Sequence, residues 1–114
     1  MDNFKKFAVV GSGSWGSAIA AHLTRIHQSV VIYSDSREVA DEINNRKTNS
    51  RYLESVALPS NLVATDNIAE ITNSEVIFIV VPSHAFGNVL QEMEKHSVPL
   101  TTVFVIATKG ISSN

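Results

Sequence analysis

Gly11-Ser12-Gly13-Ser14-Trp15-Gly16 decides the fold, because of the patterns that stand on either side of it. Before it comes the apolar run Phe7-Ala8-Val9-Val10, which is typical of a buried strand. After it Ile19, Leu23 and Ile26 recur at spacings of four and three residues, as on one face of a helix. A strand, a glycine-rich turn and a helix in this order predict a dinucleotide-binding loop.

Each glycine of this turn has its own expected task. Gly11 would let the chain turn sharply as it leaves the strand, Gly13 would let the backbone approach a pyrophosphate, and Gly16 would let the helix lie close to the strand. The amides and the positive dipole end at the helix N-terminus would then face the anion. No Gly-Lys-Ser/Thr follows, so the spacing is not that of a P-loop. The alternative is a purely architectural turn between strand and helix.

The length and composition of the chain suit one globular domain. It has 114 residues, of which 44% are hydrophobic and 18% charged, and its formal net charge is −2. This charge gives no electrostatic basis for binding nucleic acid or an anionic membrane. No apolar run has the roughly 18 residues of a membrane span, and the absence of cysteine excludes a disulfide framework. The N-terminus leads directly into the first strand without a signal peptide, so we expect a cytoplasmic location.

The rest of the chain alternates short apolar runs with helical patterns. We expect four further strands, at residues 30–33, 62–65, 76–81 and 103–107. The helical patterns lie at Val39 and Ile43, at Ile68 and Ile71 after a cap at Asp66 or Asn67, and at Phe86, Val89, Leu90 and Met93. Residues 44–61 form a polar excursion that we expect to be pinned by Tyr52, Leu53 and Leu58.

Four of the five expected strands are unbroken apolar runs rather than alternating patterns. Such runs predict a parallel sheet that helices cover on both faces. Because crossovers are right-handed, the fold class we predict is α/β, with a Rossmann-like doubly wound parallel sheet in three layers, α/β/α. The sequence stops where the fifth strand ends, whereas a full dinucleotide fold continues to a sixth, so we expect a fold truncated after strand five.

Asp35 stands near the end of the second strand, where an acidic side chain would hold the ribose 2′-hydroxyl of NAD and repel the 2′-phosphate of NADP. Its rival role is that of a helix N-cap, because Asp35 and Glu38 have capping-box spacing. Ser34, Ser36 and Arg37 could instead cradle a phosphate, which would suit NADP. The cofactor is therefore NAD or NADP, and Asp35 favours NAD.

Further candidate side chains follow the predicted strands at the carboxyl edge of the sheet, where ligands of such folds bind. Trp15 could pack on a neighbouring loop or form a wall beside the cofactor. His84 has no nearby partner to orient it, which favours a solvated or capping role over that of a general base. Phe86 opens an apolar stripe and is expected in the core, and Lys109 is either a solvated loop residue or an anion ligand. No histidine spacing fits a metal site.

Several motifs together resemble a known family, the NAD(P)-dependent glycerol-3-phosphate dehydrogenases. They are Gly11-Ser12-Gly13-Ser14-Trp15-Gly16-Ser17-Ala18-Ile19-Ala20, Arg51-Tyr52-Leu53, Leu58-Pro59, Val81-Pro82-Ser83-His84-Ala85-Phe86 and Thr108-Lys109-Gly110, in the family's own order. The resemblance covers essentially the whole chain, so residues 1–114 would be the N-terminal NAD(P)-binding domain. It implies hydride transfer between NAD(P)H and the pair dihydroxyacetone phosphate and sn-glycerol 3-phosphate, a step that supplies phospholipid precursors in bacteria.

The resemblance also implies roles for particular residues. Ser14 and Trp15 would contact the cofactor, Phe86 would lie near it, and Lys109 would bridge the cofactor and the substrate phosphate. The cofactor-binding residues we expect, by chemistry and by resemblance together, are Gly11, Gly13, Ser14, Trp15, Gly16, Asp35, Ser36, Phe86 and Lys109.

The chain departs from the family pattern at two places. Asp35 and Ser36 stand where bacterial members often carry Arg or His, which argues against the usual NADPH preference. Glu54 follows Leu53 where the family has proline, so that loop would differ.

The family's catalytic lysine belongs to a C-terminal helical domain, which we expect beyond Asn114. This chain would then bind cofactor without turning over its phosphorylated substrate, and the full-length protein would be a homodimer. Two alternatives remain at this stage. One is the cofactor domain of another two-domain hydroxy-acid reductase, and the other is a non-catalytic nucleotide-sensing module.

Overall fold

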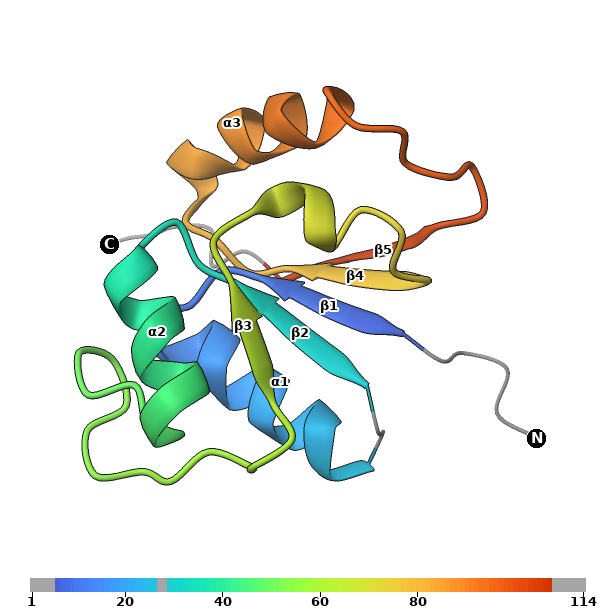
Figure 1. The fold of residues 1–114 in the computed structure, drawn as a ribbon. Coiled ribbons are helices and arrows are strands. Elements are labelled where there is room, and N and C mark those ends of the chain that lie inside the picture. Colours follow the sequence, from blue (N-terminus) through green and yellow to red (C-terminus); the bar gives the residue numbers. More distant parts are fainter. Residues whose placement is uncertain (1–5, 27–28, 108–114) are drawn as a thin grey trace.

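A five-stranded sheet forms the centre of the molecule (Figure 1), in a computed structural model that describes residues 6–26 and 29–107. All of its strand pairs are parallel, and the strand order is β3-β2-β1-β4-β5. Along the chain the elements are β1 (Phe7–Val10), α1 (Ser14–Ile26), β2 (Val30–Tyr33), α2 (Arg37–Arg46), β3 (Val63–Thr65), the 3-10 helix η1 (Ile68–Glu70), β4 (Val76–Ile79), α3 (Ser83–Glu94) and β5 (Val103–Ile106). The predicted Rossmann-like doubly wound sheet is confirmed.

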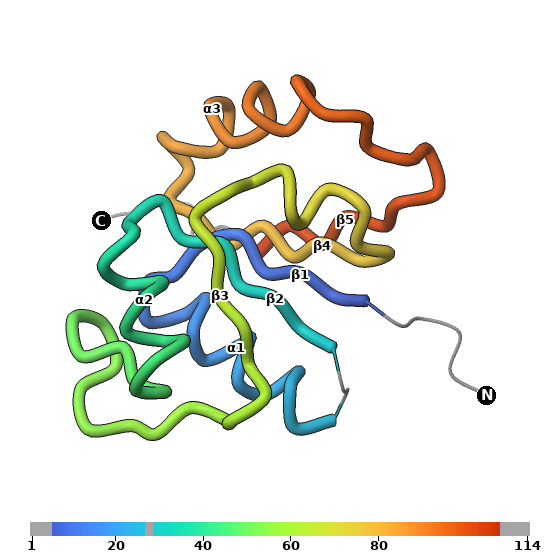
Figure 2. The backbone as a smooth tube through the Cα atoms, viewed as in Figure 1, coloured from blue at the N-terminus to red at the C-terminus, as the bar shows by residue number. Residues whose placement is uncertain are grey.

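The two halves of the chain wind in opposite directions from β1. The strands β1, β2 and β3 run toward one edge of the sheet, and β4 and β5 run from β1 toward the other. Because each crossover is right-handed, this reversal places α1 and α2 on one face and η1 and α3 on the other (Figures 1 and 2). In such sheets the reversal opens a crevice at the carboxyl ends of the two central strands, here β1 and β4.

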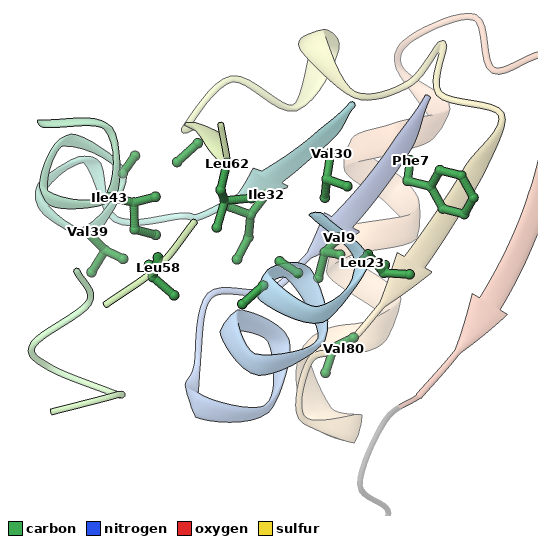
Figure 3. Close-up of a cluster of buried hydrophobic side chains, with 14 of the residues drawn as sticks. Phe7, Val9, Leu23, Val30, Ile32, Val39, Ile43, Leu58, Leu62 and Val80 are labelled. Atoms are coloured by element: carbon green, nitrogen blue, oxygen red, sulfur yellow. The ribbon is translucent and has the colours of Figure 1, made fainter. Parts of the chain in front are cut away.

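The strands of the sheet centre bury side chains on both faces, because successive residues point to opposite sides. Val9 of β1 and Ile32 of β2 are fully buried in the cluster that packs under α1 and α2 (Figure 3). Val10 of β1 is fully buried in the cluster on the other face, with Ile79 of β4 and Met93 of α3. Apolar side chains on both faces explain why the β1 sequence is an unbroken apolar run.

The edge strand β5 departs from the expectation that both faces of the sheet are covered. Its Val103, Phe104 and Ile106 are exposed, although its sequence is as apolar as that of β4. In the described part of the chain the helices pack over β1 to β4, and of the β5 residues only Val105 packs against a core cluster. An apolar run therefore predicted the strand but not its burial.

The ends of three strands also differ from the prediction. β4 stops at Ile79 rather than Val81, β5 stops at Ile106, and β3 begins at Val63. Val80 still donates its amide to Val10 O at 2.8 Å, so the chain continues the path of β4 for one residue before Pro82.

None of the helices in residues 6–26 and 29–107 is long and apolar enough to cross a membrane.

The excursion between α2 and β3 is pinned by Leu53 and Leu58, as we expected, but not by Tyr52. Residues 44–46 complete α2, and the segment that follows is held by Leu58 and Asn49, which are 5% and 0% exposed. Leu53 packs beside the first core cluster, as expected. Tyr52, which we expected to pin the segment, is 44% exposed and turns toward the carboxyl edge of the sheet instead.

Candidate functional site

The glycine loop connects β1 to α1 at the crevice between β1 and β4. Gly11 has a φ of +121°, and a Cβ built on it would lie 2.0 Å from the carbonyl oxygen of Val80. A Cβ built on Gly16 would lie 2.1 Å from the carbonyl oxygen of Gly11. Both positions therefore require glycine for steric reasons internal to the protein, one where the chain turns beside β4 and one where α1 lies against the loop.

Gly13 is different from the other two glycines. A Cβ built on it would meet no protein atom within 4 Å, and its φ is not in the left-handed region. Neither packing nor backbone conformation requires glycine at this position. The missing side chain instead leaves open room beside the start of α1, and the first helical hydrogen bond there runs from Ser17 N to Gly13 O at 2.9 Å. Amides that precede this bond have no acceptor within the helix.

A cleft of about 540 Å³ has Gly13 in its wall. The glycine loop, the end of β2, the segment after β4 and one face of α3 form its walls. Those walls include Gly11, Gly13, Tyr33, Asp35, Tyr52, Pro82, His84, Asn88 and Glu92.

A smaller hollow of about 220 Å³ also has Gly13 in its wall. Ser14, Trp15, Gly16 and Ala107 line it. Gly13 and residues 80–82 line both hollows, so the two adjoin at the glycine loop. Two adjoining hollows fit a ligand with two ends joined by a central anionic group.

The start of α2 decides between the rival roles of Asp35. Ser36, and not Asp35, is the N-cap of α2, because its Oγ accepts a hydrogen bond from Val39 N at 3.3 Å. The capping alternative for Asp35 is therefore wrong. The Asp35 side chain is exposed at the wall of the larger cleft, where it is available to a ligand.

The residues that could have cradled a phosphate at the end of β2 do not come together. Ser34 is fully buried, and its Oγ accepts hydrogen bonds from Ser12 Oγ at 2.8 Å and Ser36 N at 3.0 Å. Arg37 lies beside Asp41, 3.8 Å away, on the exposed side of α2. Ser34 thus makes buried hydrogen bonds, Ser36 caps α2 and Arg37 lies beside Asp41, so the three side chains do not form one phosphate site.

The wall of the cleft near β2 is acidic. Burial raises the pKa of the Tyr33 hydroxyl, and the charges of Asp35, Glu92 and Asp66 raise this pKa further. Asp35 and Glu92 line the same cleft as Tyr33. A ligand that brings additional negative charge to this end of the cleft would meet carboxylate repulsion.

The structure places the remaining predicted residues unequally. Phe86 is partly buried against the second core cluster and lines neither hollow, and Ser36 likewise lines neither. His84 is exposed at the wall of the larger cleft. Lys109 lies outside the described residues.

Sequence reasoning missed Asn88 and Glu92, although a signal for them existed. His84, Asn88 and Glu92 are spaced by four residues, so they share one face of α3, and this polar face lines the larger cleft. It also missed Tyr52 as a wall residue, because nothing in the spacing of residues 44–61 relates them to the sheet edge.

A further hollow of about 580 Å³ between α2 and the segment after it does not have the chemistry of an anion site. Glu38, Asp41 and Glu42 contribute carboxylates to its lining. Glu42 is already engaged, since it accepts hydrogen bonds from Thr48 Oγ1 at 2.6 Å and Ser50 N at 2.8 Å. These bonds, the one from Thr48 first, lower the pKa of Glu42 and tie the segment to α2.

Comparison with known proteins relates this fold and site to one family. The sequence pattern described as "NAD-dependent glycerol-3-phosphate dehydrogenase N-terminus" matches residues 6–114. A protein of Rickettsia bellii (strain OSU 85-389), named glycerol-3-phosphate dehydrogenase, NAD(P)+, is 40% identical over 114 residues, which cover 100% of this chain and 36% of that protein. A protein of the same name from Orientia tsutsugamushi (strain Boryong) is 36% identical over 96% of this chain and 33% of its own length.

Solved structures give the same relation. The crystal structure of glycerol-3-phosphate dehydrogenase from Coxiella burnetii is 33% identical to this chain with a TM-score of 0.85, covering 94% of this chain and 33% of that one. A Synechocystis arogenate dehydrogenase is 17% identical with a TM-score of 0.70 over 90% of this chain and 32% of its own, a likeness of fold alone. The chain spans about a third of the length of the curated relatives it matches.

Proposed function

This chain belongs to the NAD-dependent glycerol-3-phosphate dehydrogenase family, and from that premise we propose that it binds a nicotinamide dinucleotide across the glycine loop. The observation that carries the proposal is Gly13, whose absent side chain leaves open room where the two hollows adjoin. The diphosphate of the cofactor would lie there. Gly11, Gly13 and Gly16 would shape the loop, and the amides at the start of α1 would donate to the diphosphate oxygens.

A second helix end supports an anion at this position. The N-cap position of α3 is Pro82, which offers no side-chain hydrogen bond to the helix. Pro82 borders both hollows, so the positive end of the α3 dipole lies at the same site as that of α1. Two helix N-termini at one site favour a group that carries negative charge.

The adenosine end of the cofactor would occupy the larger cleft, with NAD favoured over NADP. Asp35 would accept hydrogen bonds from the ribose hydroxyls. The 2′-phosphate of NADP would bring a second dianionic group toward Asp35 and Glu92, and the side chains that could have balanced it are turned elsewhere. Ser36 would act indirectly in this proposal, by fixing the start of α2 next to Asp35.

The nicotinamide end would occupy the smaller hollow. Ser14 and Trp15 would contact this half of the cofactor, with Trp15 as one wall. Phe86 would support the site from the core rather than touch the cofactor, because it packs against the second core cluster. Lys109 would contact the cofactor and the substrate phosphate, as the family resemblance implies.

For the whole protein we propose the interconversion of sn-glycerol 3-phosphate and dihydroxyacetone phosphate, a source of phospholipid precursors. When bound, the nicotinamide cofactor would supply or accept the hydride. The residues of this chain would bind and orient the cofactor. The lysine that moves the proton would lie beyond Asn114.

Titration of the chain with NADH and NADPH tests the proposal. Trp15 is the only tryptophan of the sequence and borders the smaller hollow, so its fluorescence should report binding directly. The proposal expects saturable quenching by both cofactors and tighter binding of NADH. Absence of binding to either cofactor, checked by calorimetry, would refute the dinucleotide site, and tighter binding of NADPH would refute the role given to Asp35.

A further inference from the structure

The segment after α2 sends one buried side chain to the glycine loop. Asn49 is 0% exposed, and its Nδ2 donates hydrogen bonds to Ser12 O at 2.9 Å and to Ser17 Oγ at 2.9 Å. The Ser17 hydroxyl donates in turn to Ser12 O at 3.2 Å. The Ser12 carbonyl thus receives donors from two separate parts of the chain.

The donors of Asn49, rather than its size, explain its presence in the core. The Ser12 carbonyl can only accept, so the Nδ2 of Asn49 must face it, and the reverse orientation would place two acceptors together. In this orientation Asn49 Oδ1 is buried with no hydrogen-bond partner among the described residues. An unpaired buried acceptor destabilises a protein, so an apolar residue would serve packing alone at least as well.

The anchored carbonyl fixes the direction of the next amide. The peptide bond between Ser12 and Gly13 is trans, so its C=O and N–H lie in one plane and point in opposite directions. The carbonyl points toward Asn49 and Ser17, which are both fully buried. The N–H of Gly13 therefore points away from these two side chains, and Gly13 lines both hollows.

A second tie holds the same residue from the side of β2. The Ser12 hydroxyl donates to Ser34 Oγ at 2.8 Å, and both residues are buried. Rotation of the peptide would bring the Ser12 carbonyl toward the diphosphate and replace a donor by an acceptor. The ties to Ser12 oppose this rotation.

We propose that Asn49 is a positioning residue for dinucleotide binding, which with Ser17 clamps the Ser12 carbonyl and so aims the Gly13 amide at the diphosphate. This inference rests on the proposed dinucleotide function. Asn49 is not expected to touch the cofactor.

The variant Asn49→Leu tests the clamp, because leucine has a similar size and no donor. Asn44→Leu is the matched control. Asn44 also makes two hydrogen bonds with backbone, from its Nδ2 to Ala64 O at 2.9 Å and from Ala64 N to its Oδ1 at 2.8 Å, but these join α2 to β3 away from the loop. We expect Asn49→Leu to lower the affinities for NADH and for inorganic pyrophosphate about tenfold, because the binding-competent conformation of the loop would be less populated. Asn44→Leu should leave both affinities unchanged while it lowers the urea midpoint.

The amide resonance of Gly13 separates positioning from general stability. It should shift in ligand-free Asn49→Leu and stay in place in Asn44→Leu. If Asn49→Leu does not fold, Ser17→Ala removes the other donor to the carbonyl with a smaller change, and we expect binding about threefold weaker. Unchanged NADH affinity in a folded Asn49→Leu, or in Ser17→Ala where the first variant fails, overturns the inference. Failure of the unmodified chain to bind NADH would instead overturn the proposed function.

Discussion

Gly13→Val should remove dinucleotide binding while the fold survives. A Cβ at Gly13 meets no protein atom within 4 Å, and the backbone there is accessible to any residue. The free energy of unfolding should therefore change by less than about 1 kcal/mol. We expect this free energy to increase, because replacing glycine lowers the conformational entropy of the unfolded chain. The valine side chain would occupy the room that we assign to the diphosphate.

The size of the binding loss follows from the hydrogen bonds at stake. A hydrogen bond to a charged group contributes about 1.5–3 kcal/mol. Displacement of the diphosphate by one side chain would break two such bonds, from amides at the start of α1, which corresponds to a loss of about 3–6 kcal/mol. The dissociation constant for NADH should then rise by roughly 10²- to 10⁴-fold.

Isothermal titration calorimetry with NADH measures this change, with urea unfolding of each variant alongside. Gly87→Val is the matched control, because a Cβ at Gly87 of α3 also meets nothing within 4 Å and Gly87 lines neither hollow. The control should bind NADH as the unmodified chain does. A folded Gly13→Val that binds NADH with unchanged affinity would refute the reasoning, and a Gly13→Val that unfolds would show that this glycine serves architecture.

Three further predictions concern the walls of the site and the stability of the fold. Asp35→Ser removes the carboxylate that faces the ribose, so competitive titration should show the affinity for NADPH rising roughly tenfold relative to NADH; an unchanged ratio would contradict the assignment. Ser36→Ala removes the N-cap of α2, and urea unfolding should show a loss of about 1 kcal/mol, whereas no loss would mean that the bond to Val39 N contributes nothing. The pKa of Glu42 is lowered in the folded chain from 4.5, so its hydrogen bonds stabilise the fold above pH 4.5 and this contribution is lost as the pH falls through the lower folded value. Glu42→Gln should therefore reduce the difference between the urea midpoints at pH 7 and pH 3, and an equal difference in both proteins would contradict this linkage.

The order of the elements could be predicted because each signal is local. The residues before Gly11 and after it form a strand and a helix on their own patterns, and right-handed crossovers then leave few topologies. The burial of β5 could not be predicted in the same way. An apolar run such as 103–106 shows which residues favour a strand, but whether its faces are covered depends on elements elsewhere in the chain.

In the candidate site, too, features formed by neighbouring residues could be predicted and contacts between distant residues could not. The glycine loop is contiguous in sequence, so its chemistry could be recognised from spacing. Asn49 reaches Ser12 across 37 positions of the sequence, and no periodicity connects the two. At the end of β2, the capping-box spacing pointed to Asp35 as the possible cap of α2, whereas the structure shows Ser36 in that position, with φ −108° and ψ 117°. Glu92 is the exception, because its spacing from His84 and Asn88 was open to interpretation from the sequence.

The most direct test of the account is a crystal structure of this chain with NADH. We predict that the diphosphate lies beside Gly13, with one of its oxygens about 2.7–3.1 Å from the Gly13 amide nitrogen. The adenosine ribose should then lie within hydrogen-bond distance of Asp35. A diphosphate bound elsewhere, or a glycine loop whose open room is filled by side chains of the protein itself, would contradict the central claim.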